Sequence, residues 1–531
     1  MLGMDCTVVS DFEKGNYNHS KYYFDCILKG DVNTGGRFSH VIAPFGSLAH
    51  KTSFRTLCLF GKNDDERLFN EIDKLTSFMK STIIFVDYTF NEQFRRELSD
   101  RIKRGKYGEI YMVVDRVMFL YLVTHYQTES IIRKFVNVAM PYSYYQPYIY
   151  DSMSKMPPEM FFGRTDELQK IEDRNGIHLL YGGRQLGKSA LLKRAKLSIN
   201  AVPGQRALYI DIKNKTVPEA SEMICEEMIS LGLFTENQVY DDWKSLCKDL
   251  KESIIRNKIT YFLLLLDEGD IFINDCAAYS YSPIEEMKRI MESVDFKFVI
   301  AGLHNLARYD RKSAMSDNSV IPHLKTLTIK PFKNMEARKL LEVPLAQVGL
   351  FFNNDALIST ILATTNYFPG LIQLYCSKLI TSLQDIDKTI YPITSVPPYY
   401  INEKHIQKVL ANEEFTHQIK EKFDITLELD NDNYYQIIAL LMAEMYHSDD
   451  VMNHSVGYSA DEVYARGCEY EIHKISSLDP DVFTVYMDEL VELNIFRKHP
   501  DNSYTFLRQN FFQLMGNSDE IYDRLQKYID E

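Results

Sequence analysis

Short apolar segments, separated by longer amphipathic stretches, run through the middle of this chain. The most apolar is Tyr261 to Leu266, an unbroken run that is typical of a strand buried on both faces of a parallel sheet. Four further segments have strand-like length and composition. With this run they predict five parallel strands with helices on both faces, at residues 177–181, 206–212, 261–266, 296–303 and 324–329.

The N-terminal part also alternates between the two periods. Residues 55–60, 82–87 and 110–115 are strand-like, and residues 64–80 and 91–104 have helical spacing. This alternation predicts a small three-layer α/β domain, whereas the first fifty residues have weak periodicity and receive no assignment. Asp87 and Asp115 fall at carboxyl ends of strands, where a ligand site is conceivable, but polar strand ends entering loops are the favoured explanation.

Beyond Pro331 and Phe332 the pattern becomes helical. Helical spacing at 335–342, 355–364 and 370–383 predicts a helical lid. An amphipathic helix is expected at 433–446, a capping box at 459–462, a third helix at 481–493 and a hairpin from strands 495–498 and 504–507, which together indicate a winged helix. We therefore expect four domains: 1–155, an N-terminal α/β domain; 156–332, the α/β core; 333–415, the lid; and 416–531, the winged helix.

Composition limits the class of protein. Hydrophobic residues make up 45% and charged residues 25% of the 531, as in ordinary globular proteins. The longest apolar runs are far too short for a membrane span and no signal peptide is recognised, so a cytoplasmic location without membrane contact is expected. The eight cysteines lack metal-binding spacing, which favours free thiols.

The net charge of −14 is concentrated at one end of the chain. Residues 420–531 contain 23 Asp/Glu and 9 Lys/Arg, so the remaining 419 residues are neutral in sum. Binding to a nucleic acid backbone depends on cationic side chains. An acidic C-terminal domain therefore argues against nucleic acid as its partner.

The segment 182–189 carries the most specific chemistry. It is Gly182, Gly183, Arg184, Gln185, Leu186, Gly187, Lys188 and Ser189, a Walker A phosphate-binding loop, and Ala190 follows it. The glycines let backbone N–H groups surround phosphate oxygens, Lys188 reaches the β- and γ-phosphates, and Ser189 ligates Mg²⁺. A strand before the loop and a helix after it place the bound anion at the N-terminus of that helix.

Two further polar groups follow core strands. Asp267 and Glu268 end the apolar run, where Asp267 would hold Mg²⁺ and Glu268 would polarise the attacking water; an acidic turn after a core strand is the alternative. His304 and Asn305 end the strand at 296–303. Asn305 is the better candidate to sense the γ-phosphate, and Arg308 or Arg311 is a candidate arginine finger or else an ordinary surface arginine.

The order of these parts resembles the STAND ATPases and the related origin-recognition-like AAA+ ATPases of bacteria and archaea. The resemblance is carried by six features. They are the strap Phe162, Gly163 and Arg164, the segments 181–189, 264–268, 298–305 and 366–373, and the predicted winged helix. The resemblance covers about residues 155–531. It implies ATP and Mg²⁺ as ligands, a strap over the adenine, Pro369 at the nucleotide, an ADP-bound resting form closed by the winged helix, oligomerisation, and a role in antiviral defence. The chain departs from it in two ways, because residues 370–377 contain no sensor arginine and no repeat array follows the winged helix.

Three functions stay open from the sequence. The first is an ATP-hydrolysing molecular switch that controls self-assembly or a protein partner. The second is a DNA-handling AAA+ ATPase, acting in loading, transposition or nuclease complexes, which would use the winged helix or the basic run 103–106. In the third, the N-terminal domain is an effector enzyme regulated by the ATPase, although no catalytic constellation is recognisable there.

Overall fold

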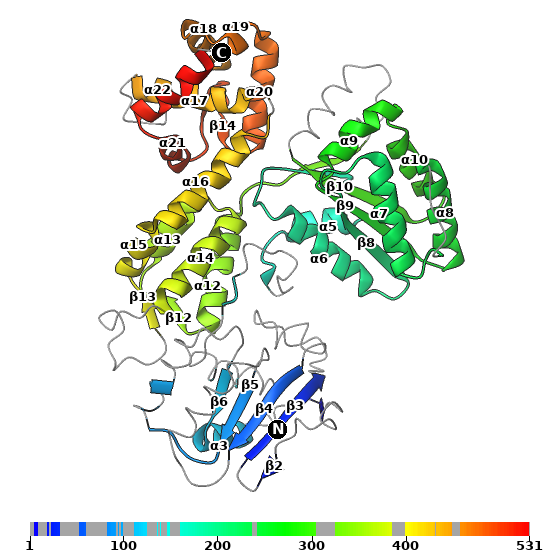
Figure 1. The fold of residues 1–531 in the computed structure, drawn as a ribbon, viewed down its shortest axis with the longest axis vertical. Coiled ribbons are helices and arrows are strands. Elements are labelled where there is room, and N and C mark those ends of the chain that lie inside the picture. Colours follow the sequence, from blue (N-terminus) through cyan, green and yellow to red (C-terminus); the bar gives the residue numbers. More distant parts are fainter. Residues whose placement is uncertain are drawn as a thin grey trace. The chain divides into compact units, whose positions relative to one another are not determined.

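A computed structural model of the chain describes most of residues 160–235, 242–303, 324–384, 399–430, 432–448 and 457–529, together with strands and scattered residues within 5–148 (Figure 1). The chain forms two compact units. One comprises Met1–Phe162, Lys333–Tyr367 and Leu371–Thr416, and the other comprises Gly163–Phe332, Phe368–Gly370 and His417–Glu531. No helix in the described part of the chain combines the length and the apolar character needed to cross a bilayer.

The second unit contains a five-stranded, wholly parallel sheet in the order β11-β7-β10-β9-β8. Its strands are β7 (Leu179–Tyr181), β8 (Gln205–Asp211), β9 (Tyr261–Asp267), β10 (Phe296–Gly302) and β11 (Thr326–Thr328). All five lie where the apolar runs predicted them. Strand β10 is inserted between β7 and β9, so the α/β fold class of a phosphate-binding-loop NTPase core is confirmed.

Helices cover both faces of this sheet (Figure 1). On one face α6 contacts β8 and β9, and α5 contacts α6. The other face is covered by helices whose apolar sides share one core with the strands. The helices are α5 (Thr165–Glu172), α6 (Lys188–Asn200), α7 (Val217–Ser230), α8 (Trp243–Arg256), α9 (Asp270–Cys276) and α10 (Ser282–Met291).

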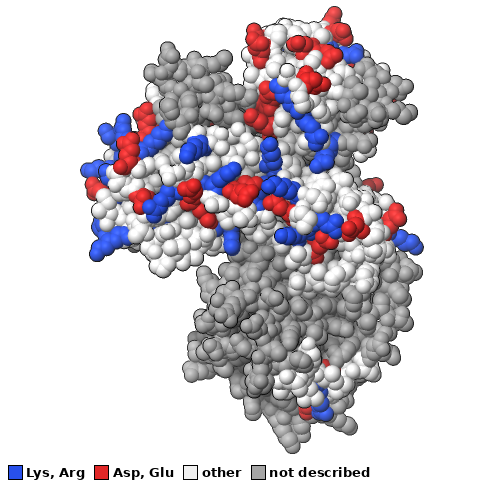
Figure 2. All heavy atoms as spheres, turned by 180° about the vertical axis from the view of Figure 1, so that it is seen from behind, with Lys and Arg blue, Asp and Glu red and all other residues white. Residues whose placement is uncertain are grey.

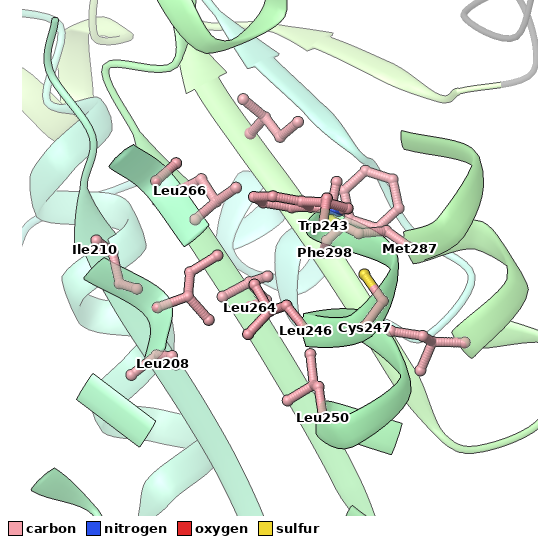
Figure 3. Packing of buried hydrophobic residues seen from close by; sticks show 14 of the residues in the cluster. Leu208, Ile210, Trp243, Leu246, Cys247, Leu250, Leu264, Leu266, Met287 and Phe298 are labelled. Atoms are coloured by element: carbon pink, nitrogen blue, oxygen red, sulfur yellow. The ribbon is translucent and has the colours of Figure 1, made fainter. Parts of the chain in front are cut away.

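Helix α8 and strand β9 pack against each other in this shared core. Figure 3 shows Trp243 and Leu246 of α8 directed toward Leu264 and Leu266 of β9. The Trp243 indole N–H donates to the Pro283 carbonyl oxygen at 3.1 Å, which satisfies its polar atom inside the core. Because Trp243 is the sole tryptophan of the chain, its fluorescence reports on this core alone.

The C-terminal part of the second unit is helical with one hairpin. Its elements are α16 (Glu413–Leu427), α17 (Tyr434–Ser448), α18 (Ala460–Glu469), α19 (His473–Ser476), α20 (Pro480–Glu492), β14 (Phe496–Lys498), β15 (Tyr504–Phe506), α21 (Gln509–Met515) and α22 (Ser518–Ile529). Strands β14 and β15 pair antiparallel, as predicted. The capping box of Ser459 and Glu462 begins α18 as predicted.

Helix α17 differs from the amphipathic helix that the sequence predicted. Eleven of its residues between Tyr435 and Tyr446 are buried, because α18, α20, α21 and α22 all contact α17. Its polar residues keep partners inside this packing: Glu444 pairs with Arg466, and Gln436 accepts a hydrogen bond from Tyr528. The helix is therefore the buried centre of this region.

The N-terminal sheet of the first unit has the order β1-β3-β4-β5-β6, with β2 beside β3. Its elements are β1 (Asp5–Val8), β2 (His19–Ser20), β3 (Tyr23–Asp31), β4 (Ser53–Leu59), β5 (Thr82–Val86) and β6 (Tyr111–Val114), followed by α3 (Arg116–Thr124). The three predicted strands are confirmed and run parallel. The sheet is nevertheless mixed, because the unassigned first residues add antiparallel strands. The helix expected at 64–80 lies outside the described residues.

The lid segment supplies the rest of the first unit. Its elements are α12 (Asn334–Gln347), β12 (Leu350–Phe352), α13 (Asp355–Thr364), α14 (Pro369–Gln384), β13 (Tyr399–Ile401) and α15 (Glu403–Leu410). The three predicted lid helices are thus confirmed. Strands β12 and β13 form a short parallel pair that the helical pattern did not predict.

One buried tyrosine joins the segment before the core to helix α12. Pro344 lies inside α12 and has no N–H to complete the helical ladder. The Tyr148 hydroxyl lies beside this step of the helix: it donates to the Leu341 carbonyl oxygen at 2.8 Å and lies 3.3 Å from the Leu340 carbonyl oxygen, the one that Pro344 leaves without a helical donor. Burial raises the pKa of Tyr148 well above its ordinary value. Tyr148 is therefore anchored in helix α12.

Candidate functional site

The phosphate loop connects β7 to α6, as predicted. Gly182 has φ +148°, and a Cβ added there would lie 2.8 Å from the Ile329 carbonyl oxygen, so a side chain would collide with the end of β11. Gly187 has φ +88° and precedes the first residue of α6. Both positions need glycine for backbone reasons. They produce the turn that aims the N-terminus of α6 at the space where an anion would lie.

Lys188 lies inside this loop. Its Nζ donates to the carbonyl oxygens of Gly182 at 2.6 Å and Gly183 at 3.0 Å. Burial lowers the pKa of Lys188, and the nearby carboxylates of Glu268 and Asp267 act in the opposite direction. The ammonium is thus buried with acidic groups close by, and phosphate oxygens could replace the two carbonyls as its partners.

The two Walker B candidates end β9, at the edge of the sheet where the loop lies. The Asp267 carboxylate is buried and accepts two hydrogen bonds, from the Tyr209 hydroxyl at 2.8 Å and from the Glu268 backbone N–H at 3.1 Å. Glu268 has φ +56°, which is uncommon for a residue with a Cβ. This conformation turns the chain sharply away from the strand at the expected catalytic carboxylate.

Oxygen donors are available for a magnesium ion. The Asp267 carboxylate and the Ser189 side chain both lie near the Tyr209 hydroxyl, which donates to the carboxylate at 2.8 Å. Magnesium prefers oxygen ligands and keeps several waters, so one hydroxyl and one carboxylate fit it. Ser189 and Asp267 would hold the ion, which would neutralise phosphate charge when bound.

Two residues of this site were missed by reasoning from the sequence. Tyr209 lies on β8, and burial and the neighbouring Asp267 raise its pKa. Asp270 begins α9 and accepts a hydrogen bond from the Leu303 backbone N–H at 2.9 Å, which ties the turn after β9 to the end of β10. Burial also raises the pKa of Asp270. Its position three residues after Asp267 was the one available signal.

Arg164 of the strap binds protein carbonyls. Its guanidinium donates to the Leu186 carbonyl oxygen at 3.1 Å and the Lys330 carbonyl oxygen at 2.5 Å, and it lies 4.8 Å from the ring centre of Phe332. Arg164 and Gly163 both have positive φ. The side chain therefore holds the phosphate loop to the segment after β11.

The start of α14 also contacts the phosphate loop. The Gly370 N–H donates to the Gln185 carbonyl oxygen at 3.1 Å, and the Pro369 ring lies 3.8 Å from a Cβ added at Gly187. A Cβ at Gly183 would lie 3.0 Å from the Leu493 carbonyl oxygen, just after α20. Gly183 occupies a variable position of the Walker A pattern, so this close approach gives a reason for glycine there.

The sensor and arginine-finger candidates belong to a segment that the structure does not describe. His304, Asn305, Arg308 and Arg311 lie outside the described residues, which end at Leu303 on this side. The sensor and arginine-finger roles therefore stay predictions.

In the N-terminal sheet, Asp115 is fully buried and its carboxylate accepts from the Met118 and Phe90 backbone N–H groups at 2.9 and 3.1 Å. It caps α3, and Asp87 forms an exposed ion pair with Arg116. These contacts give both acids a structural role at the strand ends.

Charged side chains on α20, which corresponds to the helix predicted at 481–493, are partly neutralised by neighbouring groups. Asp488 of α20 accepts from Lys498 Nζ at 2.9 Å and from the Tyr504 hydroxyl at 2.8 Å. Glu489 is buried and accepts from the Tyr435 hydroxyl at 2.5 Å. Figure 2 shows basic and acidic side chains interspersed over the described residues on the face drawn. Lys498 is therefore engaged with α20.

No protein-family model and no curated protein matches the chain. Among solved structures, similar folds include the Walker-type ATPase paby2304 of Pyrococcus abyssi, at 15% identity and TM-score 0.45, covering 67% of this chain and 96% of that one. Cdc6p of Pyrobaculum aerophilum has 13% identity and TM-score 0.34, covering 69% and 94%. The ORC1 protein of Aeropyrum pernix, solved in complex with DNA, has 14% identity and TM-score 0.34, covering 70% and 94%. Similarity this low gives no grounds for transferring their ligands or activities.

Proposed function

We propose that this chain is an ATP-binding and ATP-hydrolysing molecular switch of the AAA+/STAND type. The observation that carries the proposal is the meeting of three groups at one sheet edge: the phosphate loop after β7, Lys188 inside it, and Asp267 with Glu268 after β9. Phosphoryl transfer depends mainly on positioning and charge neutralisation, and these groups supply both.

Each group has a separate task in the proposed reaction. Lys188 would exchange its two carbonyl partners for the β- and γ-phosphates, and the N-terminus of α6 would stabilise the remaining charge. Glu268 would orient and polarise the attacking water. Asp270 would keep the turn that carries Glu268 in register with the end of β10.

The switch is supported by what touches the loop. The Leu493 carbonyl next to Gly183 and the Pro369–Gly370 turn next to Gln185 bring two distant segments of the chain to the phosphate loop. A nucleotide that changes the loop would change both contacts. We propose that the C-terminal helices and hairpin form a winged helix that closes the ADP-bound resting form. The resemblance to STAND ATPases supports the next step of the proposal: ATP binding would permit self-assembly or control of a protein effector in antiviral defence.

Glu268→Gln tests the hydrolytic part. The variant should retain ATP affinity, because an amide keeps the size and polarity of the side chain, while turnover should fall at least about 100-fold. Bound nucleotide, phosphate release and molecular mass would be measured together, with ADP and with a non-hydrolysable ATP analogue. Undiminished hydrolysis by the variant would remove Glu268 from the mechanism. If the protein had the same molecular mass with ADP and with the ATP analogue, nucleotide-controlled self-assembly would be ruled out.

DNA handling is the alternative function, and it makes a different prediction. A DNA-binding ATPase would show an affinity that falls steeply as salt rises. The ion pair between Lys498 and Asp488 counts against the hairpin as a backbone-binding surface. A salt titration of DNA binding separates the two functions, since we expect no steep slope.

A further inference from the structure

Tyr209 occupies a position between the two expected magnesium ligands. It lies on β8 beside β9, paired in register with Leu265, two residues before Asp267. From there its hydroxyl donates to the Asp267 Oδ2 at 2.8 Å. Its ring is held separately, because the Lys193 ammonium lies 5.1 Å from the ring centre.

Two donors fix the orientation of the Asp267 carboxylate. A carboxylate only accepts hydrogen bonds, so the single hydroxyl proton of Tyr209 points to its Oδ2. The Glu268 backbone N–H donates to its Oδ1 at 3.1 Å. The remaining lone pairs of the carboxylate stay available to a metal ion.

We propose that Tyr209 is a positioning residue that orients Asp267 for magnesium. The inference rests on the proposed nucleotide-binding function and deepens it. Partners that orient metal ligands commonly change metal affinity by about 10- to 100-fold when they are removed. Tyr209 would act in this way through its hydroxyl, with its ring as a fixed support.

Tyr209→Phe removes the hydroxyl and keeps the ring and its cation contact. Binding of a fluorescent N-methylanthraniloyl-ADP would be titrated with and without magnesium, followed by a magnesium titration at fixed nucleotide. We expect the half-saturating magnesium concentration to rise about tenfold or more. Affinity in excess EDTA should stay within about twofold of wild type, since the phosphate loop itself is untouched; a merely structural defect would weaken both affinities.

Tyr261→Phe is the matched control. Tyr261 lies at the opposite end of β9, and its hydroxyl donates to the Glu172 carbonyl oxygen at 3.2 Å, so the variant also loses one tyrosine hydroxyl from the same sheet. It should titrate with magnesium like wild type. Equal magnesium dependence of wild type and Tyr209→Phe, or an equal shift in Tyr261→Phe, would overturn the role of Tyr209. Wild-type protein that binds no nucleotide under either condition would instead overturn the proposed function.

Discussion

Mild acid should destabilise the five-stranded core through one buried imidazole. His178 precedes β7 and is only 8% exposed, and neither of its ring nitrogens has a hydrogen-bond partner among the described residues. Burial, followed by the charges of Lys297, Lys288 and Lys325, lowers the pKa of His178 to about 4. The folded protein therefore keeps this ring neutral at pH values where an unfolded chain, with a histidine pKa of about 6.5, protonates it.

The size of the effect follows from these two pKa values. The unfolded state binds more protons between about pH 6.5 and pH 4, so the free energy of unfolding falls as pH falls through this window. Between pH 7 and pH 5 the linkage relation gives about 2 kcal/mol for a fully effective shift. Partial access of water to the ring reduces this, and we expect about 1.5 kcal/mol.

Urea unfolding followed by Trp243 fluorescence measures this quantity, because Trp243 belongs to the same core. A denaturant slope of about 3 kcal/mol per molar makes the expected loss between pH 7 and pH 5 about 0.5 M in the midpoint. His178→Phe should remove that part of the pH dependence, whatever it does to stability at pH 7, because phenylalanine has no titratable group. The His178 ring that it replaces lies beside Phe298, with 5.4 Å between the ring centres. His473→Phe, at an exposed position on α19, is the control and should keep the wild-type dependence.

The comparison would refute the explanation if His178→Phe and wild type lost the same stability between pH 7 and pH 5. Acid sensitivity would then come from other groups. If His473→Phe abolished the loss of stability that wild type shows between pH 7 and pH 5, the effect would belong to His473 and not to His178.

Two further variants test contacts described above. Tyr148→Phe should destabilise α12 by about 1 to 2 kcal/mol, because the hydrogen bond from the buried hydroxyl to the Leu341 carbonyl oxygen is lost. Hydrogen exchange of α12 should accelerate, whereas Tyr400→Phe, at an exposed position, should leave it unchanged. Unaltered exchange in Tyr148→Phe would contradict a stabilising role of this hydroxyl. Gly183→Ala should raise the dissociation rate of bound ADP several-fold, because the new methyl group presses on the Leu493 carbonyl; a dissociation rate equal to wild type would mean that this contact does not restrain the loop.

The sequence predicted the core sheet well because apolar runs and loop chemistry agreed there. Strands β9 and β10 are buried along their whole length, in agreement with their continuous apolar runs, and the Walker A spelling determines the turn after β7. The first strands, β1 and β3, were missed because polar residues such as Asp25 and Lys29 interrupt their pattern. Helix α17 was misjudged because its polar side chains find partners in neighbouring helices, which periodicity does not reveal.

Site residues divide along the same line. Lys188 and Asp267 are recognisable from local spelling, whereas Tyr209 and Asp270 act through register between neighbouring strands. Register is a property of the assembled sheet, so a single strand read by itself gives no sign of it. Arg164 was assigned to a strap over the nucleotide, and its bonds to Leu186 and Lys330 became visible only with the loop in place.

The interrupted turn of α12 has a consequence for how this chain can vary. In a continuous helix each interior carbonyl accepts a hydrogen bond from the N–H four residues later. Pro344 has no N–H, so the Leu340 carbonyl oxygen lacks this partner, and the Tyr148 hydroxyl lies 3.3 Å from it and 2.8 Å from the Leu341 carbonyl oxygen. A residue with an N–H at position 344 would compete with the phenol for this part of the helix. A change that looks beneficial within one helix would then weaken the hold on the segment that joins the N-terminal sheet to the rest of its unit.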